Sequence, residues 1–304
     1  MKVGMILPQG PAHGTGGSWS AISALARQAE EGGADSLWLC DHFFWRPADG
    51  PEVGIHEAWT LLSALAVATR RVELGTLVLA TAFRNPGLLA KMASTADDVS
   101  GGRLILGLGC GWYEEEYRAF GYPFDHRVGR FDEALQVIVP LVRGERVTLH
   151  GRWTDVDDAV LVPAPDRPSL PILVAAKGDR MLRLTARHAD AWQTAWFGLP
   201  DDRIAERQDR LLAACDAEGR DPATLERTVG IGLGDLAADG APPGWRDVPV
   251  DAAAIADALT AWTELGIGHV QLRFEEASPA AYDVALEAIR RYRDGTSPDA
   301  SAAG

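Results

Sequence analysis

Short apolar runs alternate with amphipathic helical stretches over nearly the whole chain, and this alternation limits the fold more than any other feature. A strand followed by a helix favours a parallel sheet, because the helix carries the chain back to the start of the next strand. Eight such units without an interdomain linker predict a (β/α)₈ TIM barrel of the α/β class. A doubly wound sheet is the alternative, but it seldom needs eight alternations. The strands are expected at residues 3–7, 36–41, 72–79, 103–108, 172–175, 191–194, 227–231 and 269–273.

One segment departs from this alternation. Residues 144–171 contain four prolines, together with apolar residues at Val147, Leu149 and Trp153. We expect a small hairpin or excursion there, inserted between the fourth and fifth βα units. A single barrel domain is therefore expected over residues 1–294, and residues 295–304 are expected to form a disordered tail.

The charge balance narrows the classes of partner. The 304 residues include 29 lysines and arginines against 43 aspartates and glutamates, which gives a formal net charge of −14. Nucleic acids and anionic membranes attract basic surfaces, so neither is expected as a partner. No run approaches the roughly 18 apolar residues of a membrane span, and the first apolar run is too short for a signal peptide. We expect a cytoplasmic protein that acts on a small molecule.

Two polar residues end the second predicted strand, where a barrel of this kind has its active-site mouth. They are Asp41 and His42. Histidine titrates near neutral pH, which suits a group that donates or accepts a proton. His42 is therefore the candidate general acid/base, and Asp41 is expected to orient it or set its tautomer. The alternative for such a pair is a structural histidine at a capped strand end.

Glycines spaced two apart end the fourth predicted strand, at Gly107, Gly109 and Gly111, with Cys110 between the last two. Glycine lets the backbone approach a flat or phosphorylated ligand, because no Cβ stands in the way. The spacing matches the dinucleotide fingerprint G-x-G-x-x-G only in part, since Trp112 stands in place of the third glycine. The run indicates a ligand-binding loop at the mouth.

A second candidate ligand site is Lys177-Gly178-Asp179-Arg180, which lies between a predicted strand and a predicted helix. Open backbone N–H groups at a helix start, with basic side chains beside them, bind phosphate. The alternative is an ordinary helix start, with Asp179 as a favourable first-turn acid and Arg180 in solvent.

Aromatic side chains gather near the expected mouth. Five of the ten tryptophans are placed there by the predicted elements, and several together suit a pocket for a flat ring. These five are Trp45, Trp59, Trp112, Trp192 and Trp196.

Two kinds of chemistry find no support in the motifs. The seven histidines form no H-x-H or H-E-x-x-H pattern and the three cysteines form no C-x-x-C pair, so no metal site is expected. The chain also lacks the G-x-S-x-G elbow of an acyl-transfer nucleophile.

Five stretches in order carry a resemblance to a known family. The chain resembles the bacterial luciferase-like monooxygenase superfamily, and it is most similar to actinobacterial members that use the deazaflavin coenzyme F420. The resemblance covers residues 3–198 well and the C-terminal third more loosely. The stretches are residues 36–42, 56–59, 74–86, 100–116 (through Trp112 to Glu116) and 175–178.

The resemblance implies a (β/α)₈ barrel that holds the tricyclic ring of F420 at the carboxyl ends of the strands. It also implies a non-proline cis peptide at Leu77–Val78 behind the ring, a phosphate site at Lys177-Gly178, and catalysis at His42. Asp41 would contact the cofactor or orient the site. The full set of expected cofactor-binding residues is Asp41, Leu77, Val78, Gly109, Cys110, Gly111, Lys177, Gly178, Asp179, Arg180 and Thr194.

One departure from the family bears on the substrate. In the deazaflavin-dependent sugar-phosphate dehydrogenases, an acidic residue follows the glycine that corresponds to Gly111. This chain has Trp112 there, so we expect an apolar or aromatic small molecule. The substrate pocket is expected to include His13, Trp45, Trp112 and Trp196, and the family's usual homodimer is the expected assembly.

The function expected from this resemblance is hydride transfer between F420 and a small organic substrate. An FMN-dependent monooxygenase on the same barrel is the main alternative, because only carbon or nitrogen at ring position five separates the two cofactors. A non-catalytic flavin-binding protein is a third reading, and a barrel that binds a sugar phosphate without a redox role is a fourth.

Overall fold

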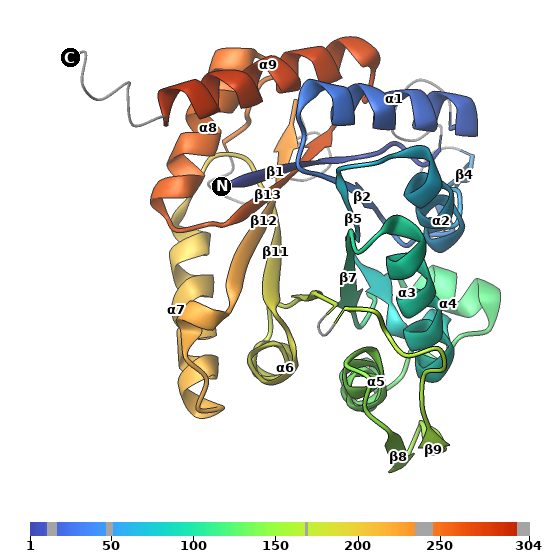
Figure 1. The fold of residues 1–304 in the computed structure, drawn as a ribbon. Helices are drawn as coiled ribbons and strands as arrows, with labels where there is room; N and C mark the ends of the chain where they lie inside the picture. The colour runs from blue at the N-terminus through green and yellow to red at the C-terminus, as the bar shows by residue number, and fades with distance from the viewer. Residues whose placement is uncertain (11–16, 47–50, 168–169, 235–245, 297–304) are drawn as a thin grey trace.

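Parallel strands close into a barrel in the computed structural model, which describes residues 1–10, 17–46, 51–167, 170–234 and 246–296. Each strand pairs with the next one in the ring, and β7 pairs with β10 to complete the closure (Figure 1). The predicted (β/α)₈ barrel is confirmed. In ring order the strands are β1 (Lys2–Ile6), β2 (Ser36–Leu39), β5 (Glu73–Thr76), β7 (Leu104–Gly109), β10 (Ile172–Ala175), β11 (Ala191–Phe197), β12 (Glu226–Leu233) and β13 (His269–Phe274).

Helices cover the outside of this ring (Figure 1). Their ends follow local signals: the side chains of Ser18, Asn85 and Ser278 accept backbone N–H groups at helix starts. Gly33 and Gly101 end helices in the left-handed conformation. The helices are α1 (Trp19–Gly32), α2 (Ala58–Ala68), α3 (Pro86–Ser100), α4 (Glu114–Phe120), α5 (Arg127–Val142), α6 (Asp179–His188), α7 (Asp202–Ala217), α8 (Ala252–Glu264) and α9 (Pro279–Gly295), with short 3₁₀ turns η2 (Thr81–Phe83) and η3 (Pro222–Thr224). None of the described helices is long and apolar enough to span a membrane.

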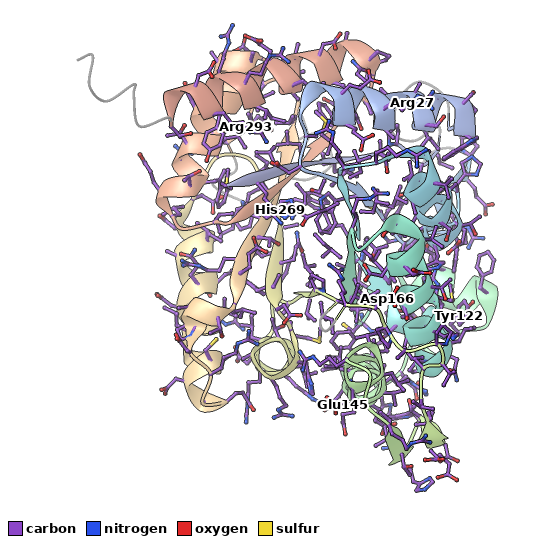
Figure 2. All side chains as sticks on the ribbon, viewed as in Figure 1. Arg27, Tyr122, Glu145, Asp166, His269 and Arg293 are labelled. Atoms are coloured by element: carbon purple, nitrogen blue, oxygen red, sulfur yellow. The ribbon has the colours of Figure 1, made fainter. Side chains whose placement is uncertain are left out.

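The barrel interior is filled by side chains of alternate strand residues. An apolar layer joins Ile6, Trp38, Leu77, Ile105, Leu173 and Ala191. Beside it, a polar chain runs from the Trp38 indole N–H to Ser36 Oγ, and from there to His269 Nε2, each at 2.7 Å. Figure 2 shows His269 among the strands. Burial lowers the pKa of His269 to about 3, so this imidazole is neutral and shares one hydrogen bond with the Ser36 hydroxyl.

The predicted strand over 72–79 is interrupted. It divides into β5 and the two-residue β6 (Leu79–Ala80), with a cis peptide at Leu77–Val78 between them. The cis bond expected from the resemblance is confirmed at this position. Gly107 of β7 lies against this bulge, since a Cβ there would stand 1.8 Å from the Thr76 carbonyl oxygen. Two further cis bonds, Val162–Pro163 and Ala195–Trp196, were not predicted.

Two small antiparallel hairpins lie outside the barrel. The segment 144–171 contains β8 (Val147–His150) paired with β9 (Asp155–Ala159), beyond α5 in Figure 1. A second hairpin, β3 (Phe44–Trp45) with β4 (Val53–Gly54), was not predicted. The helix α9 extends to Gly295, and residues 297–304 of the expected tail lie outside the described residues.

Candidate active site

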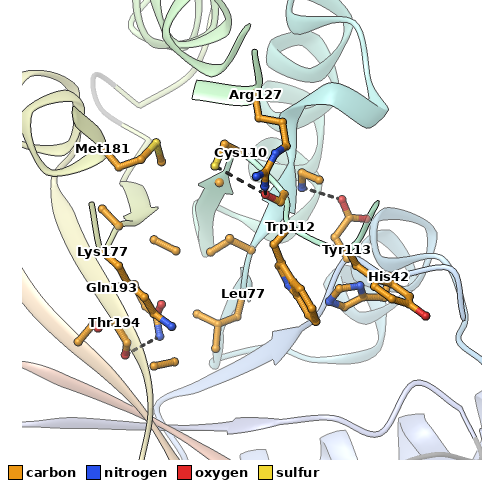
Figure 3. A pocket seen from close by; sticks show the side chains of 18 of the residues that line it. His42, Leu77, Cys110, Trp112, Tyr113, Arg127, Lys177, Met181, Gln193 and Thr194 are labelled. Carbon is orange, nitrogen blue, oxygen red and sulfur yellow. Dashed lines mark hydrogen bonds between the residues drawn. The ribbon is translucent and has the colours of Figure 1, made fainter. Parts of the chain in front are cut away.

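A cavity of about 400 Å³ opens at the carboxyl ends of the strands. Figure 3 shows His42, Trp112 and Tyr113 on one side of it and Lys177, Gln193 and Thr194 on the other. Most residues expected at the site line this cavity. They are Asp41, His42, Leu77, Val78, Gly109, Cys110, Gly111, Trp112, Lys177, Gly178, Thr194 and Trp196.

His42 is held by a carboxylate from another part of the chain. Its Nδ1 lies 2.8 Å from Oε2 of Glu116, on α4. The other oxygen of Glu116 accepts the backbone N–H groups of Phe43 and Phe44, and the Glu116 side chain is buried. Because a carboxylate only accepts, Nδ1 is the protonated nitrogen, which leaves Nε2 to exchange a proton.

The expectation that Asp41 orients His42 was wrong. The Asp41 carboxylate instead accepts Nη1 and Nη2 of Arg84 at 2.8 and 3.0 Å, and the backbone N–H of Ala80 at 2.9 Å. Arg84 also donates to Glu57, which caps α2. Adjacent residues of an extended segment point to opposite sides, so Asp41 and His42 have different neighbours. Asp41 still borders the cavity, with its charge matched by Arg84.

Aromatic rings surround His42. Trp45 lies 4.3 Å from the imidazole between ring centroids, Trp112 lies 5.7 Å away, and Tyr113 lies 6.5 Å away. Trp112 is 62% exposed although it lines the cavity, so it is open to a ligand. Trp45 contacts His42 and Trp112 but is not among the lining residues.

The remaining tryptophans that were expected near the mouth do not line the cavity as described. Trp59 and Trp192 are buried in the main core, as is common for tryptophans in a barrel. The sequence could not separate them from pocket residues, because tryptophan suits both environments. His13 lies outside the described residues.

The glycine run at the end of β7 meets neighbouring structure closely. A Cβ at Gly109 would stand 2.7 Å from Cγ2 of Val78, and one at Gly111 would stand 1.7 Å from Oη of Tyr117. Gly111 also has a φ of 70°, which favours glycine. Its carbonyl accepts Nη1 of Arg127 at 2.5 Å. The glycines therefore allow the loop to pack against the bulge and α4 while its surface faces the cavity.

Basic side chains lie on the side formed by β10 and β11. Lys177 lines the cavity, and its pKa is lowered by partial desolvation and then by the charges of Arg207 and Arg203. Gly178 is the N-cap residue of α6 and provides no side-chain cap, so backbone N–H groups of the first turn are open. Arg207 donates to Oγ1 of Thr194 at 2.5 Å.

The next two predicted residues turn their side chains elsewhere. Asp179 pairs with Arg210 at 2.7 Å, and Arg180 pairs with Asp132 at 3.4 Å. Neither lines the cavity. Any part they take in binding a ligand would therefore come through the backbone at the start of α6.

Several cavity residues were not predicted as site residues. They lie on helices, at a helix start or at a strand position, and none of them belongs to a catalytic or binding motif: Tyr113, Glu116, Arg127, Met181 and Gln193. Arg207 does not line the cavity but bonds the lining residue Thr194. The sequence could have indicated a basic helix face there, because Arg203, Arg207 and Arg210 recur at helical spacing. Among the described residues, no group of three or more His, Cys, Asp or Glu side chains is placed to hold a metal ion.

Comparison with known proteins places this site in a family. The chain is 35% identical over 220 residues to an F420-dependent glucose-6-phosphate dehydrogenase of Kineococcus radiotolerans, covering 70% of this chain and 63% of that protein. It is 33% identical over 271 residues to a phthiodiolone/phenolphthiodiolone dimycocerosates ketoreductase of Mycobacterium kansasii. That match covers 83% of this chain and 73% of the ketoreductase.

The fold is shared with a solved structure of an F420-dependent secondary alcohol dehydrogenase in complex with an F420-acetone adduct. The TM-score is 0.81 at 20% identity, over 96% of this chain and 99% of that one. The luciferase-like monooxygenase family matches residues 1–234. The chain therefore belongs to the luciferase-like monooxygenase family, as its sequence resemblance indicated.

Proposed function

We propose that this protein is an oxidoreductase that transfers a hydride between coenzyme F420 and a small organic substrate. The observation that carries the proposal is His42, which is fixed at the cavity wall through Nδ1 by the buried Glu116. The proposal is also supported by relatives whose names include an F420-dependent dehydrogenase and a ketoreductase.

The residues of the cavity fit a deazaflavin. Its volume of about 400 Å³ lies in the range of pockets for small ligands. Leu77 and Val78 offer an apolar wall to a flat ring, and the glycine loop at Gly109 lies beside them. Lys177 and the open N–H groups after Gly178 suit a phosphate. When bound, F420 would supply or accept the hydride.

The protein's own part in the reaction is to move a proton. Nε2 of His42 would give a proton to a substrate oxygen or take one from it, while Glu116 keeps the ring oriented through Nδ1. Trp45, Trp112 and Tyr113 surround the imidazole and limit the access of water.

The same aromatic rings support an apolar or aromatic substrate body. Trp112 occupies the position after Gly111 and is exposed towards a ligand. A stacked or edge-on ring next to it would bury apolar area beside His42. A homodimer is part of the proposal, and light scattering during gel filtration would test it by giving twice the 32.6 kDa chain mass.

The variant His42→Ala tests the proposed chemistry. A general acid/base contributes about 10²–10⁴-fold to rate, so turnover of F420 with an alcohol or ketone substrate should fall in that range. The dissociation constant of F420, followed by its absorbance and fluorescence, should stay within about twofold, because Lys177 and the glycine loop remain.

The conservative control is His42→Gln, which keeps a side chain of similar size without a group that titrates. It should lose rate as His42→Ala does. If either variant turns over at the wild-type rate, the proton passes through another group and the role assigned to His42 is wrong.

A further inference from the structure

The inner face of β13 carries three polar residues, which are not themselves among the cavity-lining residues, although the last of them contacts one that is. His269, Gln271 and Arg273 alternate along the strand and so point to the same side. That side is the barrel interior, because His269 bonds Ser36 and packs edge-on against Trp38. Val270 and Leu272 between them pack outward in the main core.

Arg273 is the last residue of this face, at the end of the strand where the cavity opens. Its guanidinium carbon lies 5.5 Å from the ring centroid of Trp196, which lines the cavity. Trp196 reaches across β12 only because Gly230 leaves room, since a Cβ there would stand 2.6 Å from the indole ring. The aromatic face therefore holds the guanidinium at the cavity edge.

The charge of Arg273 is also close to the end of β2. Burial raises the pKa of the Cys40 thiol to about 11, and the positive charge of Arg273 opposes this rise. Cys40 packs against the same inner layer as Trp196. Arg273 thus reaches over the top of the barrel core from β13, whereas Lys177 lies at the end of β10 with Arg207 and Arg203.

Other arginines around the mouth are satisfied by protein groups. Arg84 binds Asp41 and Glu57, Arg127 binds the carbonyl of Gly111, and Arg207 binds Thr194. Within the described ranges, Arg273 makes no hydrogen bond and no ion pair, and its side chain is half-buried. A half-buried cation without an anion is costly unless a ligand supplies one.

We propose that Arg273 binds an oxyanion of the substrate, so that the protein acts on small molecules with an apolar or aromatic body and a carboxylate, phosphate or sulfate group. This inference rests on the proposed function and names its substrate class. Trp196 would pack against the apolar body while the guanidinium donates two parallel hydrogen bonds to the oxyanion. The position of the anion would then select which part of the substrate faces His42.

Binding of simple probes to the F420-loaded protein tests the proposal. Benzoate and benzyl alcohol share a ring and differ in charge, and inorganic phosphate and sulfate test the anion without a ring. Each is titrated by calorimetry against wild type, Arg273→Met and Arg273→Lys. The control variant is Arg290→Met, which removes the same charge from an exposed ion pair on α9.

Wild type should bind benzoate more tightly than benzyl alcohol. Arg273→Met should weaken benzoate about 10- to 100-fold, as expected for loss of a charged hydrogen-bonding partner, and leave benzyl alcohol unchanged. Arg273→Lys should recover part of the affinity, and Arg290→Met should match wild type. Equal benzoate affinity in wild type and Arg273→Met would overturn the proposal, as would wild type that binds none of the anions.

A separate F420 titration distinguishes this inference from the proposed function. If Arg273→Met weakens F420 and leaves benzoate unchanged, the guanidinium meets the cofactor's own anionic groups and the substrate assignment is wrong. If the wild-type protein does not bind F420 but, titrated without cofactor, still binds benzoate more tightly than Arg273→Met does, the oxyanion site stands and the proposed cofactor is wrong.

Discussion

Glu116 is the residue on which the geometry of His42 depends. Its two oxygens accept three N–H groups of consecutive residues, from the His42 ring and from the Phe43 and Phe44 backbone. Glu116→Gln replaces one carboxylate oxygen with an NH₂ group. Because that group donates hydrogen bonds, it cannot accept one from the N–H group that faces it. We expect turnover to fall about 10- to 100-fold, the usual cost of losing such an orienting group. F420 affinity should change by less than about twofold. Steady-state rates and a cofactor titration measure both.

The matched control is Glu114→Gln, an exposed carboxylate on the first turn of the same helix. It should keep the wild-type rate. If Glu116→Gln also keeps it, His42 does not need this carboxylate.

The sequence indicated His42 through its place at a strand end, but it could not show that its partner stands 74 residues away. Asp41 was the nearer carboxylate, and only the structure shows that Arg84 occupies it.

Among the elements, the turn after β7 is closely constrained by packing at Gly111. Gly111 and Gly121 both have a left-handed backbone, with φ of 70° and 75°. A Cβ at Gly111 would meet Tyr117 Oη at 1.7 Å, whereas one at Gly121 meets nothing within 4 Å. Gly121→Ala should cost about 1 kcal/mol of unfolding free energy, for backbone strain alone. Gly111→Ala should cost a further 1–3 kcal/mol or so, because Tyr117 must move.

Urea unfolding of both variants measures this difference. Equal losses for the two would mean that the loop yields and that close packing at Gly111 does not fix it. The strands and helices of the barrel could be predicted from the sequence, because the spacing of apolar residues and the positions of helix-capping residues indicate the same elements. The cis peptide at Leu77–Val78 could be predicted only from the family resemblance. The β3–β4 hairpin was missed because two-residue strands carry no period.

For the whole molecule, the buried imidazole of His269 links stability to pH. Its pKa is lowered, chiefly by burial, from 6.5 to about 3. Between these pH values the unfolded chain binds a proton that the folded protein does not bind. The free energy of unfolding should therefore fall as pH falls from about 6.5 towards 3, with a limiting slope of about 1.4 kcal/mol per pH unit from this group. His269→Gln should lose less stability over that window.

The control is His150→Gln, in the exposed β8–β9 hairpin, which should keep the wild-type slope over the same window. Identical slopes for wild type and His269→Gln would contradict the assignment. At this scale the closed barrel and its mouth followed from strand order, since parallel strands place their carboxyl ends together. The gathering of Glu116, Arg127 and Arg207 around that mouth did not follow, because the positions of the helices that carry them depend on three-dimensional packing.

The central claim is that the cavity takes the deazaflavin. Titration of the cofactor-free protein with F420 and with FMN, side by side and followed by absorbance and fluorescence, tests it most directly. We predict saturable F420 binding that is at least about tenfold tighter than FMN binding. Tight binding of FMN with no binding of F420 would contradict the claim and would favour a flavin monooxygenase on the same barrel.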